Sequence, residues 1–350
     1  MVMNVKGYAA LAVKEDLVPH SFVRRDPRED DVVIDILYSG VCHSDIHNAY
    51  NDWGGAKYPM VPGHEIIGRV IHVGKSVTKF KVGDLAGVGC MVDSCQHCSA
   101  CEQGLEQYCE EGNTLTYNDT DRHDGLPTFG GYSDKIVVTE KFVVKVPEGI
   151  DLRGAAPLLC AGITTWSPLR HWQVGEGSKV AVVGLGGLGH MAIKLANALG
   201  AEVTLFTRSP GKEADARRLG ARHVVLSTDS VQMKASANQF DLIIDTVPYV
   251  HDLNPYIPTL ALSGTLVLVG YLGALDPFVN SVPLILGRRS VAGSVIGGIA
   301  ETQEMLDFCG QHGITADVEV INIQDINHAW QRMLKSDVKY RFVIDIASLK

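Results

Sequence analysis

The stretch that decides the fold is Lys179-Val180-Ala181-Val182-Val183-Gly184-Leu185-Gly186-Gly187-Leu188-Gly189. A short apolar strand pattern runs into a Gly-x-Gly-x-x-Gly loop, and an apolar helical pattern follows. Gly184 is expected to make the tight turn, Gly186 to let the backbone approach a pyrophosphate, and Gly189 to allow close helix–strand packing. The helix N-terminus would then receive the pyrophosphate, so all six residues Gly184, Leu185, Gly186, Gly187, Leu188 and Gly189 are expected cofactor contacts. A purely structural glycine turn is the competing interpretation.

The sequence around this loop alternates between strand and helix patterns from about residue 151 to residue 290. That alternation is typical of a doubly wound parallel sheet, so we expect an α/β dinucleotide-binding (Rossmann) domain there. Strands are expected at Lys179–Val183, Glu202–Thr207, His223–Leu226, Phe240–Asp245 and Gly264–Val269, and helices at Leu188–Leu199 and Lys212–Leu219.

The remainder of the chain has a different pattern of predicted secondary structure. Residues 1–150 are β-rich, with short apolar runs separated by turn signals, and the last sixty residues carry two helical patterns and a closing strand. We therefore expect residues 1–150 and 291–350 to form one domain, with residues 151–290 inserted as the cofactor domain. The expected elements are the strands Val32–Leu37, Ile66–Val73, Ile136–Val146 and Phe342–Ile346 and the helices Glu301–His312 and Ile323–Ser336.

The end of the strand Glu202–Thr207 predicts which nicotinamide cofactor is used. An acidic residue about twenty residues after the glycine loop would hold the ribose hydroxyl of NAD, but no acid stands there. Thr207, Arg208, Ser209 and Lys212 instead offer hydroxyls and cations, which suit the additional phosphate of NADP(H). The alternative is that Arg208 and Lys212 are ordinary surface charges of the next helix.

Composition excludes several classes of function. The 350 residues carry a net charge of −9 and include no basic patch, which argues against a nucleic-acid partner. The most apolar stretch, Val180 to Ala201, is interrupted by glycines, a histidine and a lysine, so no membrane span is expected. With no signal-like start, we expect a cytoplasmic protein whose eight cysteines are reduced or bound to metal.

Four cysteines crowd together as Cys95-x2-Cys98-x2-Cys101-x7-Cys109. Four thiolates at this spacing can surround one tetrahedral zinc and leave no position for a substrate, so the spacing predicts a structural zinc site. Unligated loop thiols and an iron–sulfur cluster are the alternatives, and zinc is preferred because no second acceptor site accompanies the run.

A second set of metal-ligand residue types is dispersed along the chain: Cys42, His64 with its neighbour Glu65, and Cys160. Two cysteines and a histidine leave one coordination position open, which is the arrangement of a catalytic zinc that receives water or a substrate oxygen. Glu65 is able to complete the shell at rest and withdraw when substrate arrives. Each residue alone is weak evidence, because a lone cysteine in an apolar run usually packs in the core.

Several stretches together resemble the zinc-dependent medium-chain alcohol dehydrogenases. They are Gly40-Val41-Cys42-His43-Ser44-Asp45, Pro62-Gly63-His64-Glu65, the four-cysteine run, Pro157 to Thr164, and Lys339 to Asp345. The last two are similar to the cinnamyl alcohol dehydrogenase branch and its bacterial NADP-dependent aldehyde reductases. The resemblance implies a GroES-like catalytic domain, a structural zinc, a catalytic zinc on Cys42, His64 and Cys160, with Glu65 as fourth or exchangeable ligand, and hydride transfer between NADPH and an aldehyde or primary alcohol.

Ser44 and His47 suit a proton relay for that reaction. A hydroxyl beside the substrate oxygen can pass a proton through the cofactor ribose to a surface histidine that titrates near neutrality. Asp45 is expected to orient His64 by accepting its second ring hydrogen. Turn capping is the alternative role for Ser44 and Asp45.

The resemblance also implies contacts to the rest of the cofactor. Thr164, Thr246, Gly270, Ser294, Val295 and Ile296 are expected on the nicotinamide side, and Arg341 at the cofactor phosphates. Trp53, Tyr117 and Ile296 are equally suited to a substrate pocket or to the core, and Cys90 and Cys309 have no assigned role. A homodimer is expected, with Ser290 to Val295 as a candidate contact.

Two other functions remain as alternatives. One is an NAD-dependent or polyol dehydrogenase on the same scaffold, against which Cys160 argues because polyol relatives usually carry glutamate there. The other is a nucleotide-binding protein without catalysis, which predicts decay of the metal-ligand set, and that set is intact.

Overall fold

The computed structural model describes residues 3–270 and 273–349, and the chain forms two compact units. The first unit comprises Met1–Cys160 with Gly297–Lys350, and the second comprises Ala161–Ile296. The junctions lie after the positions near 150 and 290 expected from sequence. The turns at 152–159 contact the sheet of the first unit, and the strand at 290–293 pairs within the second.

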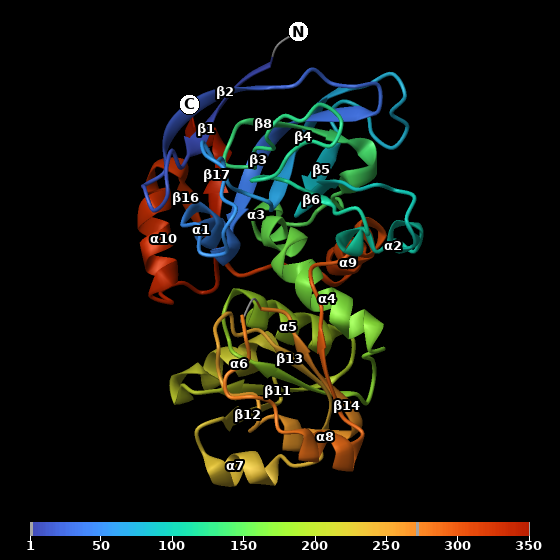
Figure 1. The fold of residues 1–350 in the computed structure, drawn as a ribbon, viewed down its shortest axis with the longest axis vertical. Coiled ribbons are helices and arrows are strands. Elements are labelled where there is room, and N and C mark those ends of the chain that lie inside the picture. Colours follow the sequence, from blue (N-terminus) through green and yellow to red (C-terminus); the bar gives the residue numbers. More distant parts are fainter. Residues whose placement is uncertain (1–2, 271–272, 350) are drawn as a thin grey trace. The chain divides into compact units, whose positions relative to one another are not determined.

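The second unit is built on a six-stranded parallel sheet in the order β12-β11-β10-β13-β14-β15 (Figure 1). Numbered within the unit, this is 3-2-1-4-5-6, the strand order of dinucleotide-binding sheets, and it confirms the expected doubly wound fold. The strands are β10 (Lys179–Val183), β11 (Glu202–Thr207), β12 (His223–Leu226), β13 (Phe240–Asp245), β14 (Leu260–Leu268) and β15 (Ser290–Gly293). The helices are α4 (Ala161–His171), α5 (Gly187–Ala198), α6 (Glu213–Leu219), α7 (Ser230–Ala235) and α8 (Ser281–Gly287).

The core of the second unit forms because its central strands are apolar on both faces. Val180, Ala181 and Val182 of β10 are fully buried, as expected for a parallel strand covered by helices. Phe206 and Phe240 meet edge to face at 5.3 Å within this core. Because β10 pairs in parallel with both β11 and β13, the carboxyl ends of these three strands lie at one edge of the sheet, where doubly wound folds bind ligands.

The first unit is β-rich and contains a sheet in the order β16-β17-β3-β4-β5-β9, with β8 paired to β3. Its strands are β1 (Met3–Ala9), β2 (Val18–Arg24), β3 (Asp31–Val41), β4 (Ile66–Val73), β5 (Leu85–Val88), β6 (Met91–Asp93), β7 (Thr114–Leu115), β8 (Lys135–Thr139), β9 (Val144–Lys145), β16 (Val318–Asn322) and β17 (Arg341–Asp345). Its helices are α1 (His43–Ala49), α2 (Ser99–Glu102), α3 (Leu152–Ala155), α9 (Ile299–His312) and α10 (Ile326–Leu334).

One expected element is wrong. Residues 136–146 do not form a single strand but divide into β8, a 3-10 turn at Glu140–Phe142, and β9. The Glu140 carboxylate accepts hydrogen bonds from the backbone N–H groups of Thr78 and Lys79, which holds the turn. The chain therefore leaves the edge of β3 and pairs with β5 instead.

The remaining expected elements match with shifts of a few residues at their ends. Helix α10 is shorter than expected, because Ile323–Asp325 adopts a 3-10 turn before it. Strand β3 is longer than expected and extends to Val41, which brings the chain to Cys42. The part of the chain that the structure describes has no helix that is both long and apolar enough to span a bilayer.

Candidate metal centres and cofactor site

Two paired strands and a 3-10 turn of the first unit bring the dispersed ligand residues together. Cys42 follows β3 and stands at the N-cap of α1, whereas His64 and Glu65 directly precede β4. β3 and β4 are antiparallel partners, and Gly40 N–H donates to Glu65 O at 2.9 Å. Cys160 follows the 3-10 turn η3 (Ala156–Leu159), which contacts the same strands. One ligand atom from each of Cys42, His64, Glu65 and Cys160 lies within 4.8 Å of the others, and all four residues are buried.

The buried carboxylate of Asp45 forms hydrogen bonds with residues of this cluster. One of its oxygens lies 3.1 Å from His64 Nδ1, and the other accepts from Cys42 N–H and from the Tyr132 hydroxyl, each at 2.9 Å. A carboxylate accepts here, so His64 Nδ1 carries the hydrogen, and Nε2 keeps a free lone pair for a metal. The expected contact between Asp45 and His64 is confirmed, while Tyr132 was not foreseen from sequence.

Glu65 forms a buried ion pair with Arg341, the first residue of β17. Burial raises the pKa of Glu65 to about 7, and the attraction of Arg341 opposes that rise. Glu65 Oε2 has no hydrogen-bond partner among the described residues although it is buried. A buried carboxylate oxygen without a partner is costly unless a ligand meets it, so this atom fits a metal.

The thiols of the cluster also fit a metal. Cys42 Sγ and Cys160 Sγ lie 4.0 Å apart. The hydrogen bond from Cys160 lowers the pKa of Cys42 well below its usual value, which favours the thiolate form that binds a metal, and the same contact raises the pKa of Cys160. Tetrahedral zinc–sulfur bonds of about 2.3 Å separate two sulfurs by about 3.8 Å, close to what is observed.

The four-cysteine lobe comes together as a separate cluster in the first unit. The Sγ atoms of Cys95, Cys98, Cys101 and Cys109 all lie within 4.8 Å of one another, and Cys95 and Cys101 are 3.9 Å apart. Backbone N–H groups point at the sulfurs: that of Cys98 donates to Cys95 Sγ at 3.3 Å, and that of Cys95 to Cys109 Sγ at 3.4 Å. The hydrogen bond from Glu110 N–H lowers the pKa of Cys98 to about 6. All eight cysteines of the chain are free of disulfides, and the lobe fits a closed zinc site.

The expected relay residues occupy one face of α1. Ser44 Oγ lies 3.6 Å from Cys42 Sγ, and His47 lies one turn further along the helix. His47 Nδ1 contacts Asp52 at 2.9 Å, and 28% of its side chain is exposed. The pair thus provides a hydroxyl beside the metal ligands and a histidine that reaches solvent.

Two expected pocket residues have different surroundings. Tyr117 is buried and stacks on the His64 ring at a centroid distance of 5.8 Å, and its hydroxyl accepts from Asn48 Nδ2. Trp53 is 43% exposed and packs its ring against His47. Tyr117 therefore supports a ligand, and Trp53 is available at the surface near the relay.

The glycine loop of the second unit has the geometry expected from its sequence. Gly184 adopts a φ of +91°, which a residue with a side chain rarely adopts. A Cβ at Gly189 would lie 2.1 Å from Gly184 O, so helix α5 packs tightly on the turn, whereas a Cβ at Gly186 would meet open space. Gly186 is also the N-cap of α5, which leaves backbone N–H groups available for an anion.

The candidate phosphate-binding residues follow β11. Arg208 and Ser209 are exposed, and Lys212 Nζ donates to Leu185 O of the glycine loop at 3.0 Å. Thr207 is buried, and its Oγ1 accepts from Ser209 N–H. A cation is thus attached to the glycine loop at the carboxyl edge of the sheet.

The other expected cofactor contacts lie in several elements. Thr164 is buried in α4, and Thr246 is buried after β13, where its hydroxyl donates to Val183 O at 2.8 Å. Gly270 follows β14, and a Cβ there would lie 2.7 Å from Val247 O. Ser294 N–H donates to Leu268 O, and Ile296 has a φ of +38°. Val295 is 37% exposed. Arg341 was expected at the cofactor phosphates, and the structure places its guanidinium on Glu65.

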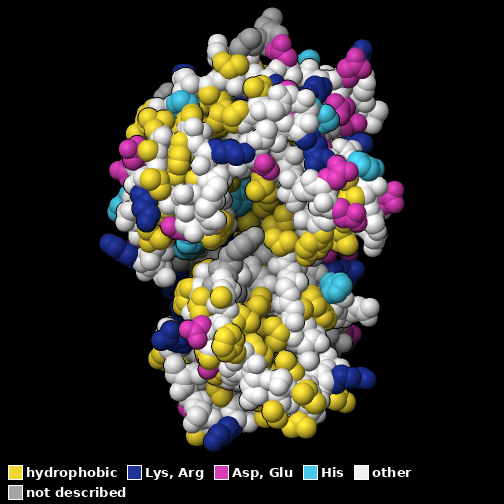
Figure 2. Space-filling model, in the orientation of Figure 1, with side chains coloured by type: hydrophobic (Ala, Val, Ile, Leu, Met, Phe, Trp, Pro, Cys, Tyr) yellow, Lys and Arg dark blue, Asp and Glu magenta, His cyan; other side chains and the backbone are white. Residues whose placement is uncertain are grey.

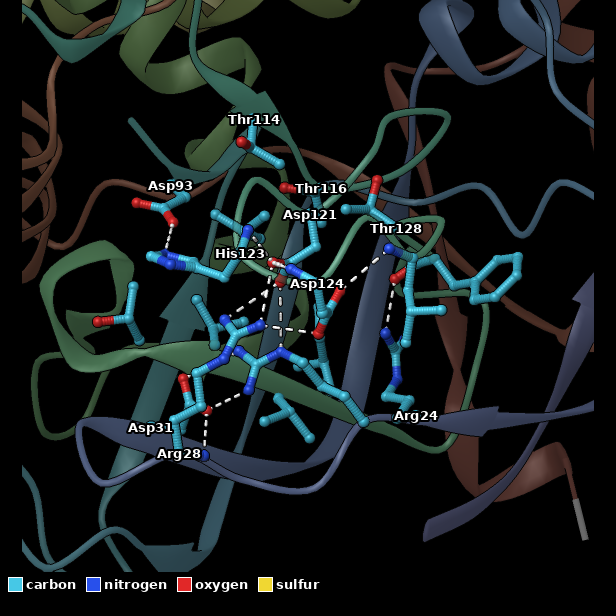
Figure 3. A pocket seen from close by; sticks show the side chains of 18 of the residues that line it. Arg24, Arg28, Asp31, Asp93, Thr114, Thr116, Asp121, His123, Asp124 and Thr128 are labelled. Atoms are coloured by element: carbon cyan, nitrogen blue, oxygen red, sulfur yellow. Dashed lines mark hydrogen bonds and ion pairs between the residues drawn. The ribbon is translucent and has the colours of Figure 1, made fainter. Parts of the chain in front are cut away.

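A separate cavity of about 210 Å³ lies in the first unit (Figure 3). Arg25 and Arg28 enter it from the segment before β3 and pair with Asp31 and Asp121. Asp93 meets His123 Nε2 at 2.9 Å on another wall. These charges pair with one another, and the ion pairs hold the loop that contains Asp121 and His123 against the sheet.

The geometry agrees with what known proteins show. Residues 28–148 match the alcohol dehydrogenase GroES-like domain, and residues 187–311 match the zinc-binding dehydrogenase model. The aldehyde reductase YahK of Escherichia coli (strain K12) is 52% identical over 99% of both chains. An NADP-dependent alcohol dehydrogenase C of Mycobacterium bovis is 51% identical over 99% of both chains.

A solved structure of a cinnamyl alcohol dehydrogenase from Sorghum bicolor is 47% identical to this chain. It superimposes with a TM-score of 0.96 over 99% of both chains. Identity of this extent over the whole length, with both metal-ligand sets in place, goes beyond a shared fold. The chain therefore belongs to the zinc-dependent medium-chain alcohol dehydrogenase family, in the branch similar to cinnamyl alcohol dehydrogenases.

Proposed function

We propose that this dehydrogenase reduces aldehydes, aromatic and aliphatic, to primary alcohols with NADPH. The observation that carries the proposal is the convergence of Cys42, His64, Glu65 and Cys160 within 4.8 Å, with Glu65 Oε2 unpaired among the described residues. The names of its relatives, an aldehyde reductase and an NADP-dependent alcohol dehydrogenase, support the same substrate class and cofactor.

Cys42, His64 and Cys160 would hold the catalytic zinc, and Cys95, Cys98, Cys101 and Cys109 the structural one. When bound, the catalytic zinc supplies Lewis-acid polarisation of the aldehyde carbonyl, and NADPH supplies the hydride. Asp45 keeps the His64 ring oriented with Nε2 directed to the metal. Arg341 neutralises Glu65 whenever that carboxylate is not a ligand, so Glu65 is able to exchange between two partners.

Ser44 and His47 would deliver the proton that the product alcohol needs. The Ser44 hydroxyl lies beside Cys42 Sγ, where the substrate oxygen must come. His47, which is partly exposed and contacts Asp52 at 2.9 Å, would take up a proton from solvent. This arrangement supplies a proton without opening the buried ligand cluster to bulk water.

The second unit would bind the cofactor along Gly184–Gly189, with the ribose phosphate at Arg208, Ser209 and Lys212. Support comes from the exposed Arg208 and from the Lys212 ammonium that is anchored on Leu185 O. Thr207 would contribute less than its neighbours because it is buried and bonded to Ser209 N–H. Thr164, Thr246, Gly270 and Ser294 to Ile296 would line the nicotinamide side. Arg341 would reach the cofactor phosphates only after leaving Glu65.

The test is oxidation of NADPH and of NADH with benzaldehyde or cinnamaldehyde, before and after chelation, with mannitol oxidation as the polyol arm. We expect NADPH to be consumed far faster than NADH and chelation to abolish turnover. Arg208→Ala should raise the KM for NADPH about tenfold and leave that for NADH unchanged, since a phosphate contact contributes on the order of 1–3 kcal/mol. Preference for NADH, or turnover of mannitol alone, would contradict the proposal.

We also propose a cytoplasmic homodimer formed through the second unit. Strand β15 is an edge strand of the parallel sheet, and the neighbouring helix α8 exposes Ile285 (74%) and Leu286 (81%). Phe278, just before α8, is 91% exposed, and Figure 2 shows apolar side chains gathered over this region. A free edge beside an apolar face suits a second copy of the same chain. Light scattering should give a dimer for the wild type and a monomer for the double variant Ile285→Lys/Leu286→Lys, and fractionation should place the protein in the cytoplasm.

A further inference from the structure

The four-cysteine lobe has one cysteine that reaches the surface. Cys95 is half-buried, whereas Cys98, Cys101 and Cys109 are buried. A zinc ion surrounded by four protein sulfurs has no coordination position left for an entering ligand. Metal therefore reaches or leaves such a site through a state in which only some of the sulfurs are bound. Cys95 is the sulfur at which that state is accessible from solvent.

Two further side chains of zinc-ligand type lie beside Cys95. One ligand atom from each of Cys95, His97 and Glu111 lies within 4.8 Å of the others. His97 Nε2 is 2.8 Å from Glu111 Oε1, and the two side chains are 70% and 54% exposed. Zinc bonds of about 2.0–2.1 Å at a tetrahedral angle separate a nitrogen and an oxygen by about 3.4 Å. A small movement of two exposed side chains is therefore enough to admit the ion.

The backbone next to Cys95 sets the orientation of the His97 ring. Gln96 has a φ of +65°, a left-handed conformation that turns the chain back, and His97 Nδ1 lies 2.7 Å from Cys95 O. A carbonyl only accepts, so Nδ1 carries a hydrogen and Nε2 is the nitrogen available to a metal. Nε2 and the Glu111 carboxylate share a proton in the structure. A zinc ion is able to replace that proton, because imidazole nitrogen and carboxylate oxygen are both zinc ligands.

The charge of the lobe segment also favours a cation. Glu110 N–H donates to Cys98 Sγ at 3.4 Å, which fixes this acidic stretch of chain against the sulfurs. Lys141, from outside the segment, donates to Gln96 Oε1 and offsets one of the negative charges. A concentration of one sign of charge raises the local concentration of counter-ions. Residues 95–112 contain no lysine or arginine and four glutamates, which are Glu102, Glu106, Glu110 and Glu111.

We propose that Cys95, His97 and Glu111 form an outer zinc site through which metal enters and leaves the four-cysteine lobe. Cys95 belongs to both sets of ligands, so the ion passes from His97 and Glu111 to the three buried sulfurs while it keeps its bond to Cys95. Each buried thiol that binds the ion loses its proton to solvent, and His97 and Glu111 recover the proton that they share. The inference rests on the proposed function in one respect, the assignment of a structural zinc to the lobe.

The first measurement is a calorimetric titration of the holoenzyme with zinc chloride. We expect the wild type, with both of its zinc sites filled, to bind one additional zinc weakly. His97→Ala and Glu111→Gln should lose this binding, and Glu111→Asp should keep it. Glu111→Gln is the sharper variant, because its amide oxygen still accepts a hydrogen bond from His97 but is not a zinc ligand of the usual kind. The matched control is His223→Ala, which alters a second exposed histidine that pairs with a glutamate, Glu202, at 3.2 Å in the second unit.

The second measurement follows the passage of the metal, as release of zinc from the holoenzyme to a chromophoric chelator. The phase that belongs to the lobe is the one that remains in Cys42→Ala. We expect this phase to slow about tenfold in His97→Ala and in Glu111→Gln, because the partly bound state loses a metal contact that stabilises it. His223→Ala should release zinc at the wild-type rate.

The two measurements are able to contradict the proposal separately. Absence of additional zinc binding by the wild type would overturn it. Release from the lobe that is unchanged or faster in His97→Ala and Glu111→Gln would overturn it as well, and faster release would mean that the pair shields the lobe. Metal analysis separates this outcome from failure of the proposed function. A wild type without lobe zinc refutes the structural assignment, whereas full zinc content with unaltered release refutes the outer site alone.

Discussion

The two cysteine clusters of the first unit place the same chemical group in opposite surroundings. In the lobe, three of the four sulfurs accept hydrogen bonds from nearby backbone N–H groups and the fourth, that of Cys101, contacts Ser94 Oγ, and the four cysteines span at most fourteen positions. In the Cys42 cluster, the partners are side chains drawn from across the chain, including Asp45, Tyr132 and Arg341. The lobe is therefore specified by local sequence, whereas the Cys42 cluster depends on distant side chains and its Glu65 is paired with Arg341.

Removing a cysteine from the four-cysteine lobe is expected to have the largest effect, and that effect should be on stability. Cys101→Ser should release the lobe zinc, whose binding contributes on the order of 10 kcal/mol where metal and folding are linked. We expect a large fall in the temperature of thermal unfolding, with the catalytic ligand set chemically intact. Calorimetry and zinc analysis check this outcome. A Cys101→Ser protein as stable as the wild type would show that the lobe does not hold a structural metal.

Removing a cysteine from the Cys42 cluster should lower activity strongly and change stability little. Cys42→Ala takes away a thiolate that the metal requires, and we expect kcat/KM for aldehyde reduction to fall by at least about 10³-fold, or roughly 4 kcal/mol. The thermal unfolding temperature should change far less than in Cys101→Ser. Steady-state kinetics measures the fall in kcat/KM, and zinc analysis measures the loss of the metal. Full activity in a variant that has lost one zinc would contradict the assignment of this cluster to catalysis.

Asp45 tests how far the surrounding side chains adjust the catalytic site. It accepts from Cys42 N–H, Gly63 N–H and Tyr132, and it contacts His64. Asp45→Asn replaces an acceptor with an NH₂ group that faces these donors, and loss of such support typically weakens metal affinity or activity by about 10–100-fold. Competition with a chromophoric chelator measures the affinity. An unchanged zinc affinity would mean that His64 is held by packing against Tyr117 alone.

The contrast between the clusters also explains what the sequence could predict. The lobe and the glycine loop depend on local spacing, so Cys95 to Cys109 and Gly184 to Gly189 were identified directly. Cys42, His64 and Cys160 were singled out by residue type, but their assignment to one zinc depended on the resemblance, because no local pattern says that β3, β4 and the turn at 156–159 meet. The alternating strand and helix patterns of residues 151–290 predicted the sheet, since burial on both faces leaves a strong apolar pattern.

Side-chain partners separated by long stretches of chain were beyond reach. The pair Glu65–Arg341 joins residues 276 positions apart, and the Glu106–Ile299 contact joins residues 193 apart. Their pairing depends on strand order and on how the lobe folds, neither of which is encoded in a short window. Arg341 was assigned to the cofactor phosphates by resemblance, and its pairing with Glu65 was not foreseen. A charged residue predicted to be buried would have been the only signal of a buried partner.

A second histidine–aspartate pair, His251 with Asp245, lies outside the Cys42 cluster and allows a comparison with His64 and Asp45. It is expected to have the smallest effect of the four predictions. His251 Nε2 contacts the buried Asp245 at 2.8 Å, and Nδ1 lies 2.8 Å from Tyr249 O. Both partners accept, so both ring nitrogens donate and the imidazolium is favoured. The hydrogen bond to Asp245 raises the pKa of His251, with burial opposing and Tyr249 O and Asp252 assisting.

Because the folded pKa of His251 is raised, its stabilisation is fully present below the unfolded value of about 6.5 and is lost as pH rises through the folded pKa. The free energy of unfolding lost in His251→Gln should therefore be about 1 kcal/mol larger at pH 6 than at pH 9, as measured by denaturant titration. Asp245→Asn should reproduce the pH dependence without lowering zinc affinity, in contrast to Asp45→Asn. A stability difference independent of pH would show that folding leaves the pKa of His251 unchanged, and a difference that grows with rising pH would show that folding lowers it.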